Sequence, residues 1–337
     1  MKWPWQRAAS SGTLVIGSHA DALAWAEAGP AGTLRGCGVE TRGTDNPADF
    51  ARRLRGLGLP ATPVTVVLAL DESQLLQIDT PAVKPEELKA AARWRIKDMI
   101  DSPLDELTID VMHVRDDRPR PHRQLFVAAA RNALIREVSE RATAAGLGLA
   151  VIDIAEATQR NLQSAAARAA GLGERATAAL MRYGAQCLLT VCAGGELFYA
   201  RRLDWDDSTL KAGGAAPPPL AQEAEMENLD FVDYGADDNG GATTADDAPR
   251  LVIELQRSFD VLERSWPDLP LAGLWVQVGE GSQALADLLH AALGMRVDVL
   301  NPESVFPGFD ALSAAPGVRD AVLPLLGGLL RAESRQL

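Results

Sequence analysis

Three short glycine-containing turns each follow an apolar run, and a turn of this kind can wrap around a phosphate group. The first turn is GSHAD, which begins with Gly17 and Ser18. The second is MRYGAQ around Gly184 and Ala185, and the third is VGEGSQ with Gly279 and Gly281. A phosphate-binding turn that works with Mg²⁺ usually has a carboxylate just before its glycine, because the hydrated cation prefers oxygen ligands. Arg182 and Tyr183 stand at that place in the second turn. The three turns therefore define a candidate nucleotide site whose chemistry is in doubt.

The turns lie between predicted strands of an α/β protein. Residues 176–203 predict a strand, a glycine turn, a second strand, another glycine turn and a third strand, and residues 13–28 predict two short strands around Gly17. Strands and helices alternate in both halves of the chain. Because the hairpins at 13–28 and 177–202 begin the two halves alike, we expect a duplicated fold with two lobes. The cleft between two such lobes is a common ligand site.

Length and charge limit the classes of function. The chain has 337 residues, of which 47% are hydrophobic, so it suits two domains or one large two-lobed domain. Its net charge of −13 makes nucleic acid an unfavourable partner. Residues 204–248 hold twelve acidic side chains against the single Lys211, and the rest of the chain is close to neutral. This segment is also rich in Pro and Gly, which predicts a flexible acidic loop at about 206–248.

The cysteines and histidines do not form a metal site in sequence. Cys37, Cys187 and Cys192 show no CxxC spacing, and the four histidines are scattered. We therefore expect no metal and three reduced thiols, as in a cytoplasmic protein.

Hydropathy predicts neither a membrane span nor a secretion signal. No apolar run approaches the roughly 18 residues that a spanning helix needs. Trp3 and Trp5 lie in an N-terminal stretch that also carries Lys2 and Arg7, which could touch a membrane interface. The alternative interpretation is a flexible tail over residues 1–12.

A helix predicted over residues 84–101 carries a possible partner-binding residue. Its apolar stripe consists of Leu88, Ala91, Ala92, Arg95, Ile96 and Met99. Trp94 lies off this stripe, on the side of Lys97. It either packs on a second surface within the protein or is an exposed anchor for a partner.

Three segments give the chain a resemblance to a known family. They are QLLQIDTPAVKPEELKAAARWRIKDMIDSPLDELTIDVMHV at 74–114, LVIELQRSFDVLERSW at 251–266 and VLPLLGGLLR at 322–331. With the three ordered glycine turns, they resemble the PilM/FtsA branch of the actin-like ATPase superfamily, and within it most closely the MshI family of MSHA-type pilus biogenesis proteins. The resemblance covers residues 13–331.

The resemblance implies a domain plan. It places a first actin-like lobe at 13–155 with a PilM-type inserted subdomain at about 71–150, and a second lobe at 156–331. The closing helix at 316–331, kinked at Pro324, returns to the first lobe, and residues 332–337 form a tail.

The resemblance also implies a nucleotide site, and this sequence departs from it. The family has a carboxylate in each phosphate loop, whereas the aligned residues here are Val15 and Arg182. Val15 cannot hold hydrated Mg²⁺ or polarise water, and Arg182 would repel the cation, although it could hold a phosphate directly. Glu280 adds a negative charge in the third turn. We expect a degenerate nucleotide-binding site and no enzyme activity. Its residues would be Gly17, Ser18, Arg182, Gly184, Ala185, Gly279 and Gly281, with no cofactor and at most weak ATP binding.

In the PilM family the domain recruits the cytoplasmic tail of a single-span inner-membrane protein. The resemblance thus implies a cytoplasmic scaffold, peripheral to the inner membrane, in the assembly platform of a type IV (MSHA-type) pilus. Partner-binding residues would be Trp94, Lys97, Gln77 and Ile78, with the tail added as a strand beside QLLQIDTPA. Two alternatives share the fold, namely an active actin-like ATPase and the cytoplasmic part of a type II secretion platform protein. The second would continue into a membrane span, and we expect the chain to end at Leu337 without one.

Overall fold

The structure is a computed structural model, and it describes residues 13–19, 21–29, 32–59, 63–114, 123–206 and 249–332. The predicted N-terminal tail at 1–12 lies outside these described residues. So do nearly all of the acidic loop, including MENLDFVDYG, and the end of the chain from residue 333.

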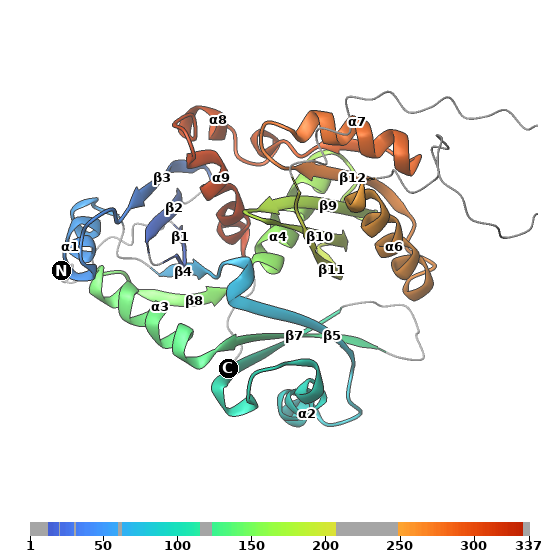
Figure 1. Cartoon of the computed structure of the whole chain (residues 1–337), viewed down its shortest axis with the longest axis horizontal. Helices are drawn as coiled ribbons and strands as arrows, with labels where there is room; N and C mark the ends of the chain where they lie inside the picture. Colours follow the sequence, from blue (N-terminus) through green and yellow to red (C-terminus); the bar gives the residue numbers. More distant parts are fainter. Residues whose placement is uncertain are drawn as a thin grey trace, which may run out of the picture.

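The first lobe is built on a five-stranded sheet in the order β3-β2-β1-β4-β8 (Figure 1). Strand β1 pairs antiparallel with β2 and parallel with β4, which pairs parallel with β8. Helices α1 and α3 pack together beside this sheet, where Phe50 and Val138 share one apolar cluster. The bounds are β1 Thr13–Gly17, β2 Ala22–Ala28, β3 Leu34–Thr41, α1 Pro47–Gly56, β4 Val64–Val67, α3 Asn132–Ala144 and β8 Leu149–Asp153.

The second lobe repeats this topology. Its sheet has the order β11-β10-β9-β12-β13, again with three antiparallel strands followed by two parallel ones. Helices α6 and α7 pack on it through Leu255 and Leu285. The bounds are β9 Ala176–Tyr183, β10 Gln186–Ala193, β11 Glu196–Asp204, α6 Arg250–Ser265, β12 Leu271–Gln277, α7 Ser282–Leu293 and β13 Val297–Val299. The predicted duplicated α/β fold is confirmed.

Helix α4 (Ala155–Ala169) lies at the centre of the molecule, between the second sheet and the end of the chain. Its Gln159 amide donates to the carbonyl oxygens of Ala179 and Leu188, at 3.1 and 2.9 Å, so buried polar contacts fix the helix to β9 and β10. Its Glu156 carboxylate accepts a hydrogen bond of 2.7 Å from Arg202 on β11. These bonds satisfy backbone and charged groups that burial would otherwise penalise.

The closing segment packs on strands of the first lobe. It comprises η6 Pro302–Ser304, α8 Phe309–Leu312, α9 Val318–Val322 and the 3₁₀ helix η7 Leu323–Leu330. The change from α to 3₁₀ geometry falls between Val322 and Leu323, just before Pro324, which has no N–H to donate. Segment η7 lies between α4 and the strands β1 and β2. A Cβ atom built on Gly327 would lie 1.7 Å from the Thr158 carbonyl oxygen, so the two backbones touch directly.

The inserted subdomain is a three-stranded sheet, in the order β5-β7-β6, with a short helix on one face. The buried side chains of α2 pack on Leu125 and Val127 of β7, and Phe126 faces Cys192 and Leu197 of the second lobe. The bounds are η1 Leu70–Glu72, β5 Ser73–Asp79, η2 Pro85–Glu87, α2 Leu88–Arg95, η3 Lys97–Met99, η4 Leu104–Glu106, β6 Leu107–His113 and β7 Gln124–Arg131.

Two boundaries differ from the expectation. The subdomain ends with β7 at Arg131 rather than near residue 150, because α3 packs on α1 and β8 joins the first sheet. The helix expected over 84–101 is α-helical only over Leu88–Arg95 and tightens into 3₁₀ turns at both ends. Leu88, Ala92 and Ile96 of the predicted stripe are buried, whereas Arg95 and Met99 are exposed.

Replacing Gly327 by alanine should destabilise the protein, because the new methyl group would overlap the Thr158 carbonyl. Overpacking of this kind costs roughly 1–3 kcal/mol. Urea denaturation of Gly327→Ala measures the loss. The control is Gly56→Ala at the end of α1, where a Cβ meets no atom within 4 Å and φ is negative enough for any residue. This change should leave stability unchanged or raise it by less than about 1 kcal/mol. Equal stability of both variants would contradict the packing.

The cysteine thiols should be unreactive in the folded protein. Burial raises the pKa of Cys187 and of Cys192 to about 12, because the thiolate is poorly solvated there. At pH 8 only about one thiol in 10⁴ is then ionised, and the thiolate is the nucleophile. Burial also raises the pKa of Cys37, which is only partly buried. A thiol reagent should modify Cys37 slowly and the other two only after guanidinium is added. Three fast reactions in native protein would contradict this.

Candidate functional site

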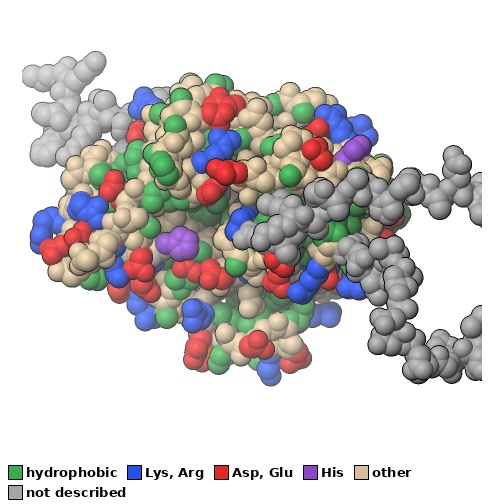
Figure 2. Space-filling view, turned by 45° about the horizontal axis from the view of Figure 1, so that its top comes forward, with side chains coloured by type: hydrophobic (Ala, Val, Ile, Leu, Met, Phe, Trp, Pro, Cys, Tyr) green, Lys and Arg blue, Asp and Glu red, His purple; other side chains and the backbone are tan. Residues whose placement is uncertain are grey.

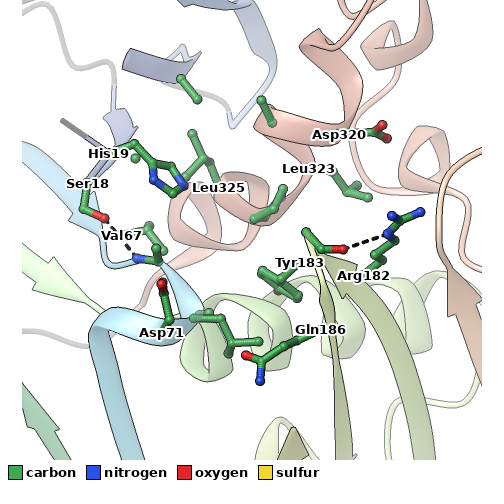
Figure 3. A pocket seen from close by; sticks show the side chains of 18 of the residues that line it. Ser18, His19, Val67, Asp71, Arg182, Tyr183, Gln186, Asp320, Leu323 and Leu325 are labelled. Carbon is green, nitrogen blue, oxygen red and sulfur yellow. Dashed lines mark hydrogen bonds between the residues drawn. The ribbon is translucent and has the colours of Figure 1, made fainter. Parts of the chain in front are cut away.

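The three glycine turns meet at one cleft between the lobes. The cleft has a volume of about 990 Å³. Six of the seven predicted nucleotide-site residues line it, namely Gly17, Ser18, Arg182, Gly184, Ala185 and Gly279 (Figure 3). Gly281 does not line the cleft and is instead the residue before α7. The turns converge because β1, β9 and β12 end at this edge of their sheets, where α/β proteins place their ligands.

In the first turn, the position of the expected carboxylate belongs to the apolar core. The Val15 side chain is fully buried and clusters with Ala24, Val67 and Leu325. A Cβ atom on Gly328 would lie 2.8 Å from the Val15 Cγ1 atom. The side chain at this position thus packs against the closing segment and offers no ligand for a cation.

The hydroxyl group of the first turn is already bonded within the protein. Ser18 Oγ donates to the Glu72 carboxylate and accepts from the Ala69 N–H at 2.9 Å. The same N–H lies 2.8 Å from Glu72 Oε2. A phosphate placed here would have to displace a carboxylate of the same sign of charge. The sequence alone did not identify Glu72, because 54 residues separate it from Ser18 and no local pattern joins them.

In the second turn, the Arg182 side chain binds the backbone of the turn itself. Gly184 has φ of +64°, which a tight two-residue hairpin turn between Tyr183 and Gln186 requires. The Arg182 Nε atom donates to the Gly184 carbonyl oxygen at 2.8 Å, and its guanidinium lies 5.2 Å from the centre of the Trp205 ring. Arg182 therefore stands where a metal-holding carboxylate was expected, and its Nε–H is used to brace the turn.

In the third turn, side chains of the protein already accept hydrogen bonds from the backbone. Gln277 Oε1 accepts from the Gly279 N–H at 3.0 Å, and Ser282 Oγ accepts from the Val278 N–H at 2.9 Å. These are the backbone donors that could have faced a phosphate. Glu280 is not among the cleft-lining residues. Sequence reasoning missed Gln277 and Ser282, although both lie within or beside the glycine motif.

The described residues offer neither a metal site nor a membrane span. Among the residues that the structure describes, no three His, Cys, Asp or Glu side chains are grouped so that they could hold a metal ion. None of the helices described is both long and apolar enough to span a bilayer.

The predicted partner residues lie on the subdomain, in two different settings. Trp94 is 68% exposed, and the Lys97 ammonium lies 5.9 Å from the centre of its ring. Trp94 is therefore not packed inside the part of the chain that the structure describes, and its exposure favours the interpretation as an anchor for a partner. Val83 and Met99 are also exposed. The large exposed apolar side chains of the described chain thus include three within residues 83–99.

The side chains of Gln77 and Ile78 are used inside the protein. Gln77 donates to the Phe198 carbonyl oxygen at 3.2 Å, and Ile78 packs with the core under α2. Alternation along β5 sends neighbouring side chains to opposite faces, and both faces of this sheet are covered. A partner at this edge could meet the backbone of these residues but not their side chains.

The comparisons with known proteins agree with the fold. Residues 49–211 match the family model described as "Type IV pilus assembly protein PilM". Among solved structures, the chain is similar to the "PilM-PilN type IV pilus biogenesis complex", with 20% identity and a TM-score of 0.64, over 95% of this chain and 98% of that one. None of the curated proteins matches the sequence.

Two other solved structures are more distant. A protein with the actin-like ATPase fold and unknown function from Bacteroides thetaiotaomicron is 9% identical, with a TM-score of 0.51 over 89% of this chain and 93% of that one. The cytoplasmic domain of EpsL from Vibrio cholerae is 14% identical, with a TM-score of 0.42 over 64% of this chain and 79% of that one. The chain therefore has the actin-like ATPase fold and contains a PilM-like domain.

Proposed function

We propose that this protein is a scaffold of a type IV pilus assembly platform, of the MSHA type, and that its subdomain binds the cytoplasmic tail of a single-span membrane protein. It would act in the cytoplasm at the inner membrane, with no hydrolysis of ATP. The observation that carries the proposal is the subdomain itself, which lies within the PilM-like region, has an edge strand at β5 and presents the exposed Trp94 on α2, the helix that contacts β6.

The edge of the subdomain sheet suits an added strand. In the order β5-β7-β6, β5 pairs only with β7, and no other described strand pairs with it. An extended tail can bond to such an edge through its backbone, while pockets for alternate side chains supply selectivity. Within β5, the side chains of Gln74 and Asp79 are exposed, whereas that of Ser73 is buried.

Trp94 would supply a separate anchor on the same subdomain, because its helix α2 contacts β6, at the opposite edge of the sheet from β5. An exposed tryptophan costs little to order and buries a large area, and such residues dominate the binding energy of interfaces. Lys97 stacks on its ring and holds a cation at the same place. The similarity to the PilM-PilN type IV pilus biogenesis complex supports the proposal, since a protein of this fold is there in a complex with a partner.

The cleft supports a role without turnover. Val15 is sealed under the closing segment, the Ser18 hydroxyl is bonded to Glu72, and Arg182 occupies the place of the second carboxylate. Positioning of Mg²⁺ and of the attacking water is the main contribution of proteins to phosphoryl transfer. A site without either carboxylate has lost that contribution.

We expect no Mg²⁺-dependent ATPase activity above background in the purified protein. Arg182→Asp should not create activity, because Val15 and the Ser18–Glu72 bond remain. Release of phosphate from ATP, measured with and without Mg²⁺, checks this. Turnover that Ala185→Trp abolishes, in a variant that still folds, would show that the cleft is catalytic.

Tail binding is tested with labelled peptides from the N-terminal cytoplasmic tails of membrane proteins encoded beside this gene. One of them should bind in the micromolar range, about −8 kcal/mol. Trp94→Ala should weaken binding by roughly 2 kcal/mol, about 30-fold, and change stability by less than about 0.5 kcal/mol.

The matched control is Val261→Ala, which removes a 44% exposed apolar side chain from α6, away from the subdomain. It should leave tail binding unchanged. If folded protein binds none of the tails, the scaffold proposal fails.

A further inference from the structure

We propose that the cleft between the lobes binds a basic, partly apolar peptide segment rather than a nucleotide. This inference goes beyond the proposed function, because it concerns the cleft and not the subdomain edge. It needs no tail to bind at β5.

The cleft is lined by more carboxylates than guanidinium groups. The lining residues include three carboxylates, Asp71, Asp204 and Asp320, against the single guanidinium of Arg182. Asp71 and Asp320 are exposed and lie on opposite walls in Figure 3. Asp204 forms an ion pair of 3.4 Å with Arg250, in which both side chains are largely exposed. A cleft built for phosphates would carry the opposite balance of charge.

Apolar residues also line the cleft. Val39, Val67, Leu70 and Leu325 line the cleft, where Val39 is partly exposed and the other three are buried. Figure 2 shows apolar side chains gathered in a hollow of the surface, beside acidic ones. Lysine and arginine suit this arrangement, because their methylene stems can lie on apolar surface while their charged heads reach carboxylates.

The cleft is also large enough for a peptide segment. A volume of about 990 Å³ lies at the upper end of the range for sites that take drug-sized ligands. It can take several side chains of an extended segment. A nucleotide of similar size would place its phosphates among Asp71, Asp320 and the Glu72 carboxylate beside Ser18, so like charges would oppose it.

Basic segments of this kind are common next to membrane spans. Loops on the cytoplasmic side of inner-membrane proteins carry an excess of Lys and Arg, and they adjoin the apolar spans. The partner that the cleft fits is therefore a protein segment with alternating basic and apolar residues.

The test uses a labelled synthetic octapeptide of alternating Leu and Lys, with fluorescence anisotropy as the readout. It should bind the full-length protein at low salt, and the alternating Leu–Glu peptide should bind at least about tenfold more weakly. A Ser–Lys peptide and spermidine, which keep the cations but lack the apolar part, should also be weaker. Equal binding of the Leu–Glu peptide, or of spermidine, would overturn the proposal.

Charge variants locate the binding. Asp71→Asn with Asp320→Asn should weaken the Leu–Lys peptide about tenfold, which corresponds to about 1.4 kcal/mol. The matched control, Glu140→Gln with Glu263→Gln, removes two exposed charges on α3 and α6 outside the cleft, and should change binding less than twofold. An equal loss in both pairs would mean attraction to the net charge alone and would overturn the proposal.

A blocking variant completes the test. Ala185 lines the cleft from an exposed turn, so Ala185→Trp should fill the cleft without disturbing the core and should abolish peptide binding. Full binding by Ala185→Trp, or loss of binding in Trp94→Ala instead, would place the peptide elsewhere and overturn the proposal. Since the tail titration depends on Trp94 and this one on the cleft, the two proposals can fail separately.

Discussion

The direct contact of Gly327 with the backbone of Thr158 is the constraint on which the centre of the molecule depends. Helix α4 is fixed to the second sheet by its glutamines, and η7 fits between α4 and the first sheet because position 327 has no side chain. The same segment then brings Gly328 against Val15 and Leu325 into the floor of the cleft. The residue that replaces the expected carboxylate is therefore a packing residue, and the way the chain closes accounts for its type.

Much of the fold could be predicted from the sequence because its signals are local. The hairpins at both lobe starts, the order of the glycine turns and the kink at Pro324 depend on residues that are neighbours in the chain. The pattern of residues 34–41 did not by itself predict β3. Gly36 and Gly38 interrupt the alternation there, and they are needed because a Cβ at either would meet the Trp25 ring at 3.0–3.3 Å.

The site was less accessible to sequence reasoning, because the contacts that decide its chemistry are long-range. The sequence placed Ser18 and Gly279 in turns, but Glu72 and Gln277, which accept their hydrogen bonds, became apparent only in three dimensions. The same holds for Ser282, which accepts from the Val278 N–H. For Gln77 and Ile78, alternation indicated two faces but could not show that the second lobe covers one of them. Trp94 shows the reverse case, since helical geometry put it off the buried stripe and the structure leaves it exposed.

The subdomain edge and the cleft between the lobes are two surfaces with different chemistry. We propose that the subdomain edge is the binding surface for a membrane partner. The most direct measurement is amide hydrogen exchange of the full-length protein with and without a bound tail peptide. The account predicts slower exchange over β5, Ser73–Asp79, because an added strand would bond to its free backbone groups. Unchanged exchange over β5 with the tail bound would contradict the claim.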